Sequence, residues 1–183
     1  MGSDFTEKKL SSKAAYRGRM LQVNEDHVEL PDGGHASREY VVHPGASLIL
    51  PIFDDDSVLL ERQFRYPAGD HFFELPAGKF EPGEPGMETA KRELLEETGY
   101  VAAEWRALGK VFPCIGYSNE VIEFFLARKL EYKRAQQLDQ GEFLETLRLP
   151  LPEALEWVRR GRINDVKTMF GLLLAEKILK DNW

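Results

Sequence analysis

The segment that decides the fold runs from Gly78 to Tyr100 and has the sequence GKFEPGEPGMETAKRELLEETGY. Its second half predicts a helix from about Gly86 to Thr98. Gly99 is expected to end this helix, because glycine readily adopts the left-handed conformation found at helix C-termini. The prolines and glycines between Pro82 and Gly86 predict a shaped loop before the helix.

The helix carries a concentrated negative charge. Glu93, Glu96 and Glu97 share one face, since residues three and four apart are neighbours on a helix. Arg92 can balance one carboxylate, that of Glu84 or that of Glu88, but not all of them. A bare acidic cluster of this kind is usually a solvated face. Here the turn at Gly78 and the loop before the helix favour a divalent cation, because Mg²⁺ takes oxygen ligands and keeps water molecules that a substrate can replace.

At every fixed position the segment resembles the Nudix box, G-x₅-E-x₇-R-E-U-x-E-E-x-G-U, in which U is a bulky apolar residue. The resemblance implies Mg²⁺-dependent hydrolysis of a nucleoside diphosphate derivative, with Mn²⁺ as a possible substitute. It implies that Glu93 and Glu97 are the main metal ligands, supported by Glu96 and the Ala77 carbonyl, and that Glu96 and Glu97 take part in catalysis. The residues to which it assigns a structural role are Gly78, Glu84, Arg92 and Gly99.

The sequence on both sides of the box predicts strands and helices in alternation. Strands are expected at 47–53, 57–64, 72–75, 108–112 and 121–127, with a turn at Asp54–Asp56. Helices are expected from Leu151 to about Arg160 and from about Asp165 to Lys180. Such mixed elements indicate a sheet layered with helices. The resemblance makes this a Nudix α/β/α sandwich with a mixed sheet, occupying residues 46–183.

The N-terminal region, residues 1–45, forms a separate prediction. Short strands between Tyr16 and Val42, around the turn Pro31–Gly34, predict a small antiparallel sheet. Such a sheet buries little apolar surface alone, so it must pack on the main body or on a second subunit. We expect a homodimer.

Four further segments, Arg38–Ala46, Glu61–Pro67, Glu74–Gly78 and Gly116–Glu120, lie around the box. With them the chain resembles the ADP-ribose pyrophosphatase branch of the family. The resemblance implies that Glu120, in the loop that begins at Gly116, is the general base or a further metal ligand; a surface glutamate is the alternative. It implies that Arg65 contacts the diphosphate, where a strand-end salt bridge is the alternative. Arg38 and Glu39 would reach the adenosine half, often from the partner subunit.

One difference from this branch concerns the part of the site that would bind the sugar of the substrate. Ile115 stands where this branch usually has a proline that shapes the pocket for the terminal ribose. The expected substrate is therefore ADP-ribose or a related nucleoside diphosphate sugar, with GDP-mannose as an alternative. A dinucleoside polyphosphate, NADH or a nucleotide triphosphate is a further alternative, which the flanking arginine and loop pattern disfavours. A catalytically silent, ligand-sensing domain of the same family is a second alternative, which the complete set of box glutamates disfavours.

The composition excludes several classes. The net charge of −7 and the lack of a dense Lys/Arg run argue against binding to nucleic acid polymers. No apolar stretch is long enough for a transmembrane helix. Cys114 is the only cysteine, which rules out an internal disulfide and a thiolate zinc site and suggests the cytoplasm. The four histidines lack zinc-site spacing.

Overall fold

The computed structural model describes residues 4–180, so the ends of the expected domain ranges, 1–3 and 181–183, lie outside the described residues. The chain divides into two compact units, each described by itself below. The first holds the described residues up to Gly45 together with Phe112–Val121; the second holds Ala46–Val111 and the chain from Ile122 onward. The assignment of 1–45 and 46–183 as separate domains stays a prediction.

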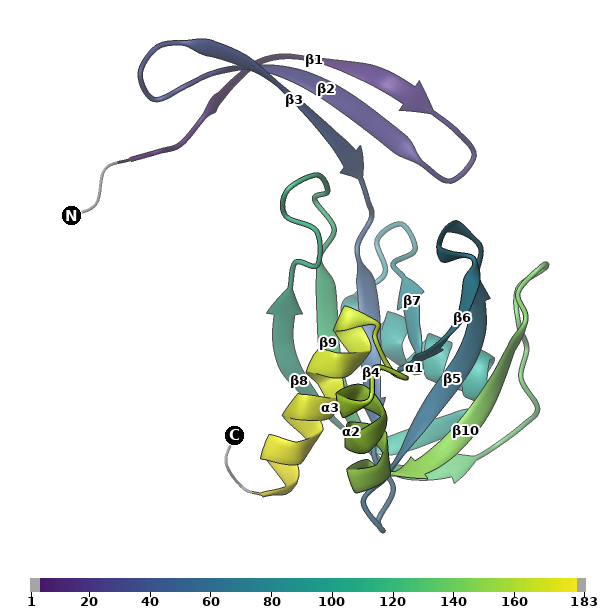
Figure 1. Ribbon diagram of the computed structural model, residues 1–183. Coiled ribbons are helices and arrows are strands. Elements are labelled where there is room, and N and C mark those ends of the chain that lie inside the picture. Colours follow the sequence, from purple (N-terminus) through teal and green to yellow (C-terminus); the bar gives the residue numbers. More distant parts are fainter. Residues whose placement is uncertain (1–3, 181–183) are drawn as a thin grey trace. The chain divides into compact units, whose positions relative to one another are not determined.

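The first unit contains one antiparallel sheet in the order β1-β2-β3 (Figure 1). Its strands are β1 (Lys8–Arg17), β2 (Gln22–Glu29) and β3 (His35–Val42). The expected turn is present, because Leu30 N–H donates to the Gly34 carbonyl at 2.7 Å and Gly33 has a φ of 83°. The sequence interpretation missed β1. Every residue of that strand is exposed, so it carries no apolar alternation to reveal it.

The loop 112–121 belongs to the first unit because it pairs with the end of β3. Val41 N–H donates to the Tyr117 carbonyl at 2.8 Å, and Asn119 N–H donates to the Val41 carbonyl at 3.3 Å. The Asn119 side chain also accepts from His43 N–H at 2.7 Å. These bonds fix the loop that carries Glu120 to the N-terminal sheet.

The second unit contains two sheets and the three α-helices. One sheet is antiparallel, in the order β10-β5-β6; the other is mixed, in the order β7-β4-β9-β8, with β4 and β9 parallel. The strands are β4 (Ala46–Pro51), β5 (Ser57–Arg65), β6 (Asp70–Glu74), β7 (Ala77–Lys79), β8 (Tyr100–Val111), β9 (Ile122–Tyr132) and β10 (Leu144–Pro150); a short 3₁₀ turn, η1 (Tyr66–Ala68), joins β5 to β6. The helices are α1 (Gly86–Thr98), α2 (Leu151–Arg159) and α3 (Val166–Leu179).

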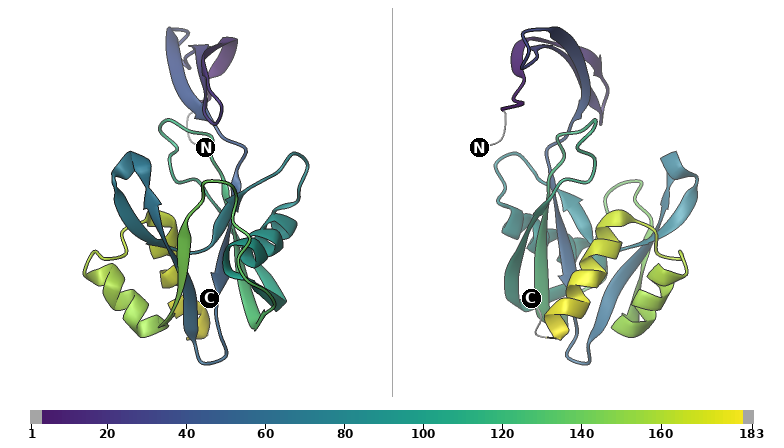
Figure 2. Two further views of the ribbon diagram at one scale, coloured as in Figure 1. Left: turned by 90° about the vertical axis from the view of Figure 1, so that its right-hand side faces the viewer. Right: turned by 60° about the vertical axis from the view of Figure 1, so that its left-hand side comes forward.

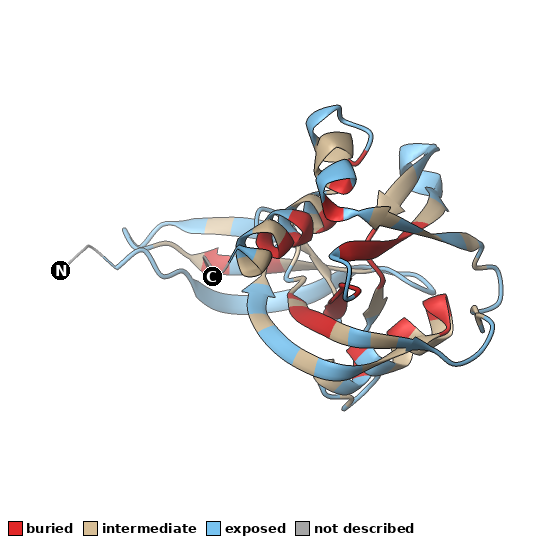
Figure 3. Ribbon diagram, turned by 90° about the horizontal axis from the view of Figure 1, so that it is seen from below, coloured by how far each residue is buried: buried red, intermediate tan, exposed pale blue. Residues whose placement is uncertain are grey.

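These strands separate two hydrophobic cores. Alternate residues of β4 face opposite ways: Leu48 and Leu50 join the larger core with α2 and α3, whereas Ile49 packs with Ala90 and Leu94 of α1. Figure 2 shows α2 and α3 on one side of the strands and α1 on the other, and Figure 3 shows buried positions gathered in these layers. This is the α/β/α sandwich with a mixed sheet that the resemblance implied.

The predicted elements of this unit are largely confirmed. The helix at 86–98 has the expected bounds, and Asp165 caps α3 by accepting from Thr168 N–H at 3.0 Å. The strands expected at 108–112 and 121–127 are too short, because β8 and β9 form a long antiparallel ribbon extending beyond the core. The half-exposed strand β10 was missed. Within residues 4–180, none of the helices has both the length and the apolar character needed to cross a membrane.

Candidate active site

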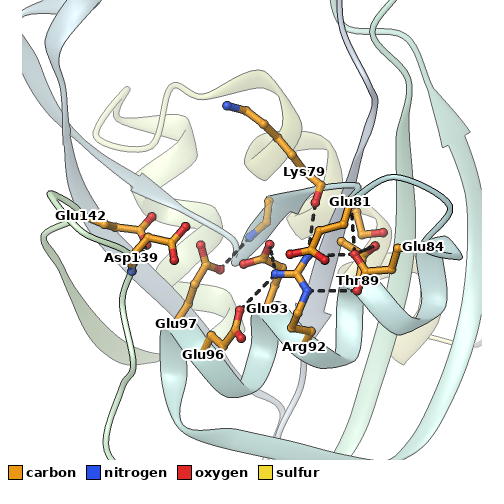
Figure 4. A network of polar contacts seen from close by, with 12 residues as sticks. Lys79, Glu81, Glu84, Thr89, Arg92, Glu93, Glu96, Glu97, Asp139 and Glu142 are labelled. Atoms are coloured by element: carbon orange, nitrogen blue, oxygen red, sulfur yellow. Dashed lines mark hydrogen bonds and ion pairs between the residues drawn. The ribbon is translucent and has the colours of Figure 1, made fainter. Parts of the chain in front are cut away.

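Helix α1 holds the acidic cluster because its two faces differ. Ala90 and Leu94 are fully buried against β4 and β9, which fixes the rotation of the helix and turns Arg92, Glu93 and Glu96 away from that core (Figure 4). Gly99 ends the helix with a φ of 77°. A side chain at Gly99 would lie 2.0 Å from the Arg134 carbonyl oxygen, so the expected structural role of this glycine has a steric reason.

Arg92 is the centre of the polar network in Figure 4. Its guanidinium donates to both carboxylate oxygens of Glu84, at 3.0 and 2.9 Å. It also donates to Glu93 at 2.7 Å and to Glu96 at 3.1 Å. Arg92 lowers the pKa of Glu84 to about 2. The loop before α1 is therefore tied to the helix through Glu84, one of the residues to which the resemblance assigned a structural role.

Gly78 is required by the close approach of Glu93. A Cβ atom at Gly78 would lie 1.8 Å from the carboxyl carbon of Glu93, far inside van der Waals contact. Strand β7 thus passes directly against the Glu93 carboxylate, and a side chain at position 78 would displace that carboxylate. Burial, with the charges of Glu96 and Glu142, raises the pKa of Glu93 although Arg92 opposes this.

Glu97 is the most buried carboxylate of the helix, with 6% of its surface exposed. One of its oxygens accepts from Ala77 N–H at 3.1 Å. Burial, and then the charge of Glu61, raise the pKa of Glu97 well above its ordinary value. Ala77 and Glu97 are therefore in direct contact through the Ala77 N–H. The expected metal contacts of the Ala77 carbonyl and the Glu97 carboxylate stay predictions.

A segment that the sequence interpretation did not single out brings two further carboxylates to α1. Gln137 N–H donates to the Glu96 carbonyl at 2.8 Å, and the Gln136 amide donates to the Glu97 carbonyl at 2.5 Å. These bonds hold the chain after β9 along the end of α1. Asp139 and Glu142 consequently lie beside the box glutamates (Figure 4).

These side chains surround a cleft of about 410 Å³. Six carboxylates and three cationic side chains line it, and two of the cations are already paired, Arg65 with Glu74 and Arg92 with Glu84. The cleft therefore has an excess of negative charge in a partly buried setting. The lining residues are Arg65, Ala77, Gly78, Lys79, Phe80, Glu81, Pro82, Arg92, Glu93, Glu96, Glu97, Gln137, Asp139 and Glu142.

The donor set fits a hard divalent cation, because it consists of carboxylate and carbonyl oxygens without a nearby sulfur or imidazole ligand in the lining. As the side chains stand between residues 4 and 180, no three acidic, His or Cys groups form a set that could hold a metal ion. Arg92 engages one oxygen of Glu93 and one oxygen of Glu96. It therefore competes with a cation for these two oxygens and leaves the other oxygen of each carboxylate to a cation.

Arg65 lines the cleft and also forms a salt bridge at the strand end. It donates to both oxygens of Glu74, at 2.6 and 2.8 Å. Lys167 bonds to the same carboxylate and to Asp165. Arg65 keeps 47% of its side chain exposed, so the pairing with Glu74 leaves part of it open. Contact with a diphosphate stays a prediction.

Three predicted residues belong to the first unit. Arg38 on β3 forms a bidentate pair with Glu7, at 2.9 and 2.5 Å, and Glu39 next to it is exposed. Glu120 is one quarter exposed, and its carboxylate lies 3.7 Å from His43 Nδ1. Their predicted roles toward substrate stay predictions.

Sequence reasoning did not identify Glu61, Asp139 or Glu142. Glu142 lies in a polar segment without a recognised motif. Glu61 lies in a predicted strand, where a charged residue normally faces solvent. The signal for Glu61 was a charged residue directly after the apolar run Val58–Leu60, which indicates a buried strand.

Comparisons with known proteins agree with this geometry. Residues 42–169 match the NUDIX domain family, and residues 7–41 match the nucleoside diphosphate sugar hydrolase N-terminal domain family. A crystal structure of an ADP compounds hydrolase superposes with a TM-score of 0.87 at 25% identity, covering 99% of this chain and 98% of that chain.

Three relatives of known name are similar over most of their length. An ADP-ribose pyrophosphatase of Bacillus subtilis is 35% identical, covering 91% of this chain and 90% of the relative. A methanol dehydrogenase activator of Bacillus methanolicus is 37% identical, covering 94% of each. A GDP-mannose pyrophosphatase of Escherichia coli is 33% identical, covering 75% of this chain and 76% of the relative.

Proposed function

This chain belongs to the NUDIX family of hydrolases, and from that premise we propose that it splits the pyrophosphate bond of ADP-ribose or a related nucleoside diphosphate sugar. The products are a nucleoside monophosphate and a sugar phosphate. The observation that carries the proposal is the cleft in which Glu93, Glu96 and Glu97 meet Asp139 and Glu142, with too few cationic side chains to balance them.

The chain's own residues divide the work of the site. Glu93 and Glu97, with Glu96 and the Ala77 carbonyl in support, hold the divalent cation, which we propose to be Mg²⁺. When bound, the cation supplies positive charge for the diphosphate and makes water more acidic. Arg65 binds the diphosphate with the part of its guanidinium that Glu74 leaves open.

Two glutamates outside α1 are candidates for the general base. Glu120 is the residue that the family resemblance suggests. Glu142 has direct geometric support, because it lines the cleft and its charge raises the pKa of both Glu93 and Glu97.

The N-terminal unit supports a homodimer. Strand β1 is exposed along its whole length, and β3 presents Arg38 and Glu39 on the same small sheet. We propose that a partner subunit covers this sheet and receives these two residues near the nucleoside of its substrate. A cytoplasmic location is proposed on the single cysteine.

The experiment is a substrate panel with the purified full chain and Mg²⁺. Release of AMP or GMP is measured from ADP-ribose, ADP-glucose, GDP-mannose, NADH and diadenosine polyphosphates. We expect the highest kcat/KM for ADP-ribose or another nucleoside diphosphate sugar. Glu97→Gln should abolish turnover while the protein stays folded; full activity of this variant would disprove the assigned cation site. Comparing Glu142→Gln with Glu120→Gln identifies the base, as the variant with the larger loss in kcat.

A further inference from the structure

Glu61 is a carboxylate at an unusual position in the second unit. It lies on β5, the central strand of its sheet, between Thr146 on β10 and Glu74 on β6. Only 4% of its surface is exposed. An acidic side chain at a central strand position is rare because the neighbouring strands on both sides exclude water.

The side chain of Glu61 lacks the partner that burial normally demands. Its Oε1 atom has no hydrogen-bond partner among the described residues. Arg65 is the cationic side chain whose charge acts on Glu61, but both oxygens of Glu74 already engage that guanidinium. A buried polar atom without a partner calls for a ligand, an ion or a proton to satisfy it.

The direction of the side chain follows from the strand. Val58 and Leu60 face the larger core, so Glu61 and Gln63 face the other side of β5. The Gln63 amide donates to Glu142 at 3.4 Å, and Glu142 lines the cleft. Glu61 therefore points toward the same group of carboxylates as Gln63.

Electrostatic effects agree with this direction. Among the charged neighbours of Glu97, Glu61 contributes most to the raised pKa, after burial itself. Burial raises the pKa of Glu61 most, followed by the charge of Glu74 on the neighbouring strand and then by the charges of Glu142 and Glu93. Glu61 is thus electrostatically coupled to the residues of the cleft even though it does not line the open space.

We propose that Glu61 is an additional carboxylate of the divalent-cation site, contributed by β5 to the group formed by Glu93 and Glu97 of α1. The inference rests on the proposed function and adds a residue that the box does not contain. A cation gives the unpartnered oxygen a positive neighbour and relieves the repulsion between Glu61 and Glu97. The site is then formed by a helix and a strand. Two rigid elements hold its carboxylates in place more firmly than a single helical turn does.

The test is the binding of Mn²⁺ and Mg²⁺ to the full chain, measured by titration calorimetry without substrate. Glu61→Gln keeps the shape of the side chain and removes its charge. We expect a 10- to 100-fold weaker affinity, about the loss seen when residues supporting a metal site are replaced. The metal-free variant should also unfold at a higher temperature than the metal-free wild type, because repulsion with Glu97 is gone.

Glu145→Gln is the matched control. It removes one negative charge from the neighbouring strand β10, where Glu145 is exposed and paired with Arg62 at 2.9 Å. This variant should bind both cations as the wild type does. If Glu61→Gln fails to fold, Glu61→Asp provides the same test, since shortening the side chain withdraws the carboxylate.

The outcomes separate this inference from the proposed function. If Glu97→Gln loses cation binding but Glu61→Gln keeps wild-type affinity, Glu61 is only a buried acid and the inference fails while the proposed function stands. If the wild type binds neither cation, or Glu97→Gln binds them normally, the proposed site fails and the role of Glu61 fails with it.

Discussion

Replacing Gly78 with alanine places a methyl group where the Glu93 side chain lies. The new Cβ would be 1.8 Å from the Glu93 carboxyl carbon, whereas ordinary van der Waals contact begins at 3.4 Å. Glu93 must therefore move by about 1.6 Å, the difference between these distances. A misplacement of about 1 Å in a catalytic arrangement can lower the rate roughly 100-fold, equal to about 2.7 kcal/mol in activation free energy.

The stability of Gly78→Ala should change little. The clashing atoms belong to the end of a flexible side chain, and Gly78 has no positive φ that alanine would strain. Moving Glu93 can break its bond with Arg92, which contributes about 1 kcal/mol. We therefore expect roughly a 100-fold lower kcat/KM for nucleoside diphosphate sugar hydrolysis, with a free energy of unfolding reduced by about 1 kcal/mol or less.

A double-mutant cycle with Glu93→Ala tests the cause. Glu93→Ala removes the atoms that clash with the new methyl group, so Gly78→Ala should cause no further loss in that background. The assay is kcat/KM in Mg²⁺ buffer, together with urea unfolding of all four proteins. Wild-type kcat/KM for Gly78→Ala, or full additivity of the two substitutions, would refute the reasoning.

Three further predictions follow from contacts around the site. Arg92 lowers the pKa of Glu84 from 4.5 to about 2, so this pair stabilises the fold above pH 4.5 and loses its effect as the pH falls through 2. At pH 7, Glu84→Gln should reduce the free energy of urea unfolding by about 1–2 kcal/mol, allowing for solvent around the pair. At pH 2.5 the reduction should be much smaller. Equal reductions at both pH values would show that the pair of Glu84 with Arg92 is not the cause. Asp165→Ala should lower the free energy of unfolding by about 1–2 kcal/mol, because it removes the N-cap of α3. Asp165→Asn should lower it by less, since asparagine can also cap a helix. If thermal unfolding ranked the two variants the other way, capping would not be the main role of Asp165. Arg65→Lys should raise KM about tenfold with a smaller change in kcat, because lysine cannot bond to Glu74 and a diphosphate in the same planar geometry. An unchanged KM would mean that Arg65 serves only Glu74.

The elements that sequence reasoning placed well have strong local signals. Helix α1 has the predicted bounds because its apolar spacing and Gly99 are local features. Strand β4 was found because it is an unbroken buried run. Strands β1 and β10 were missed for the opposite reason: their residues are exposed or half-buried, so only pairing with β2 and β5 makes them strands.

The candidate site likewise combines relations that follow from local sequence with relations that only the tertiary fold creates. By itself the sequence determined that Glu93, Glu96 and Glu97 share a helix face, since this relation depends on spacing along one helix. The spacing left Glu84 and Glu88 open as partners of Arg92, and the structure shows the pair with Glu84. Only the tertiary structure decided that Glu61 and Glu142 join them. These residues lie far from α1 in sequence, and no short-range pattern encodes which strand and which loop pack beside a helix. Their meeting depends on the burial of whole layers, which places each side chain through contacts spread across the fold.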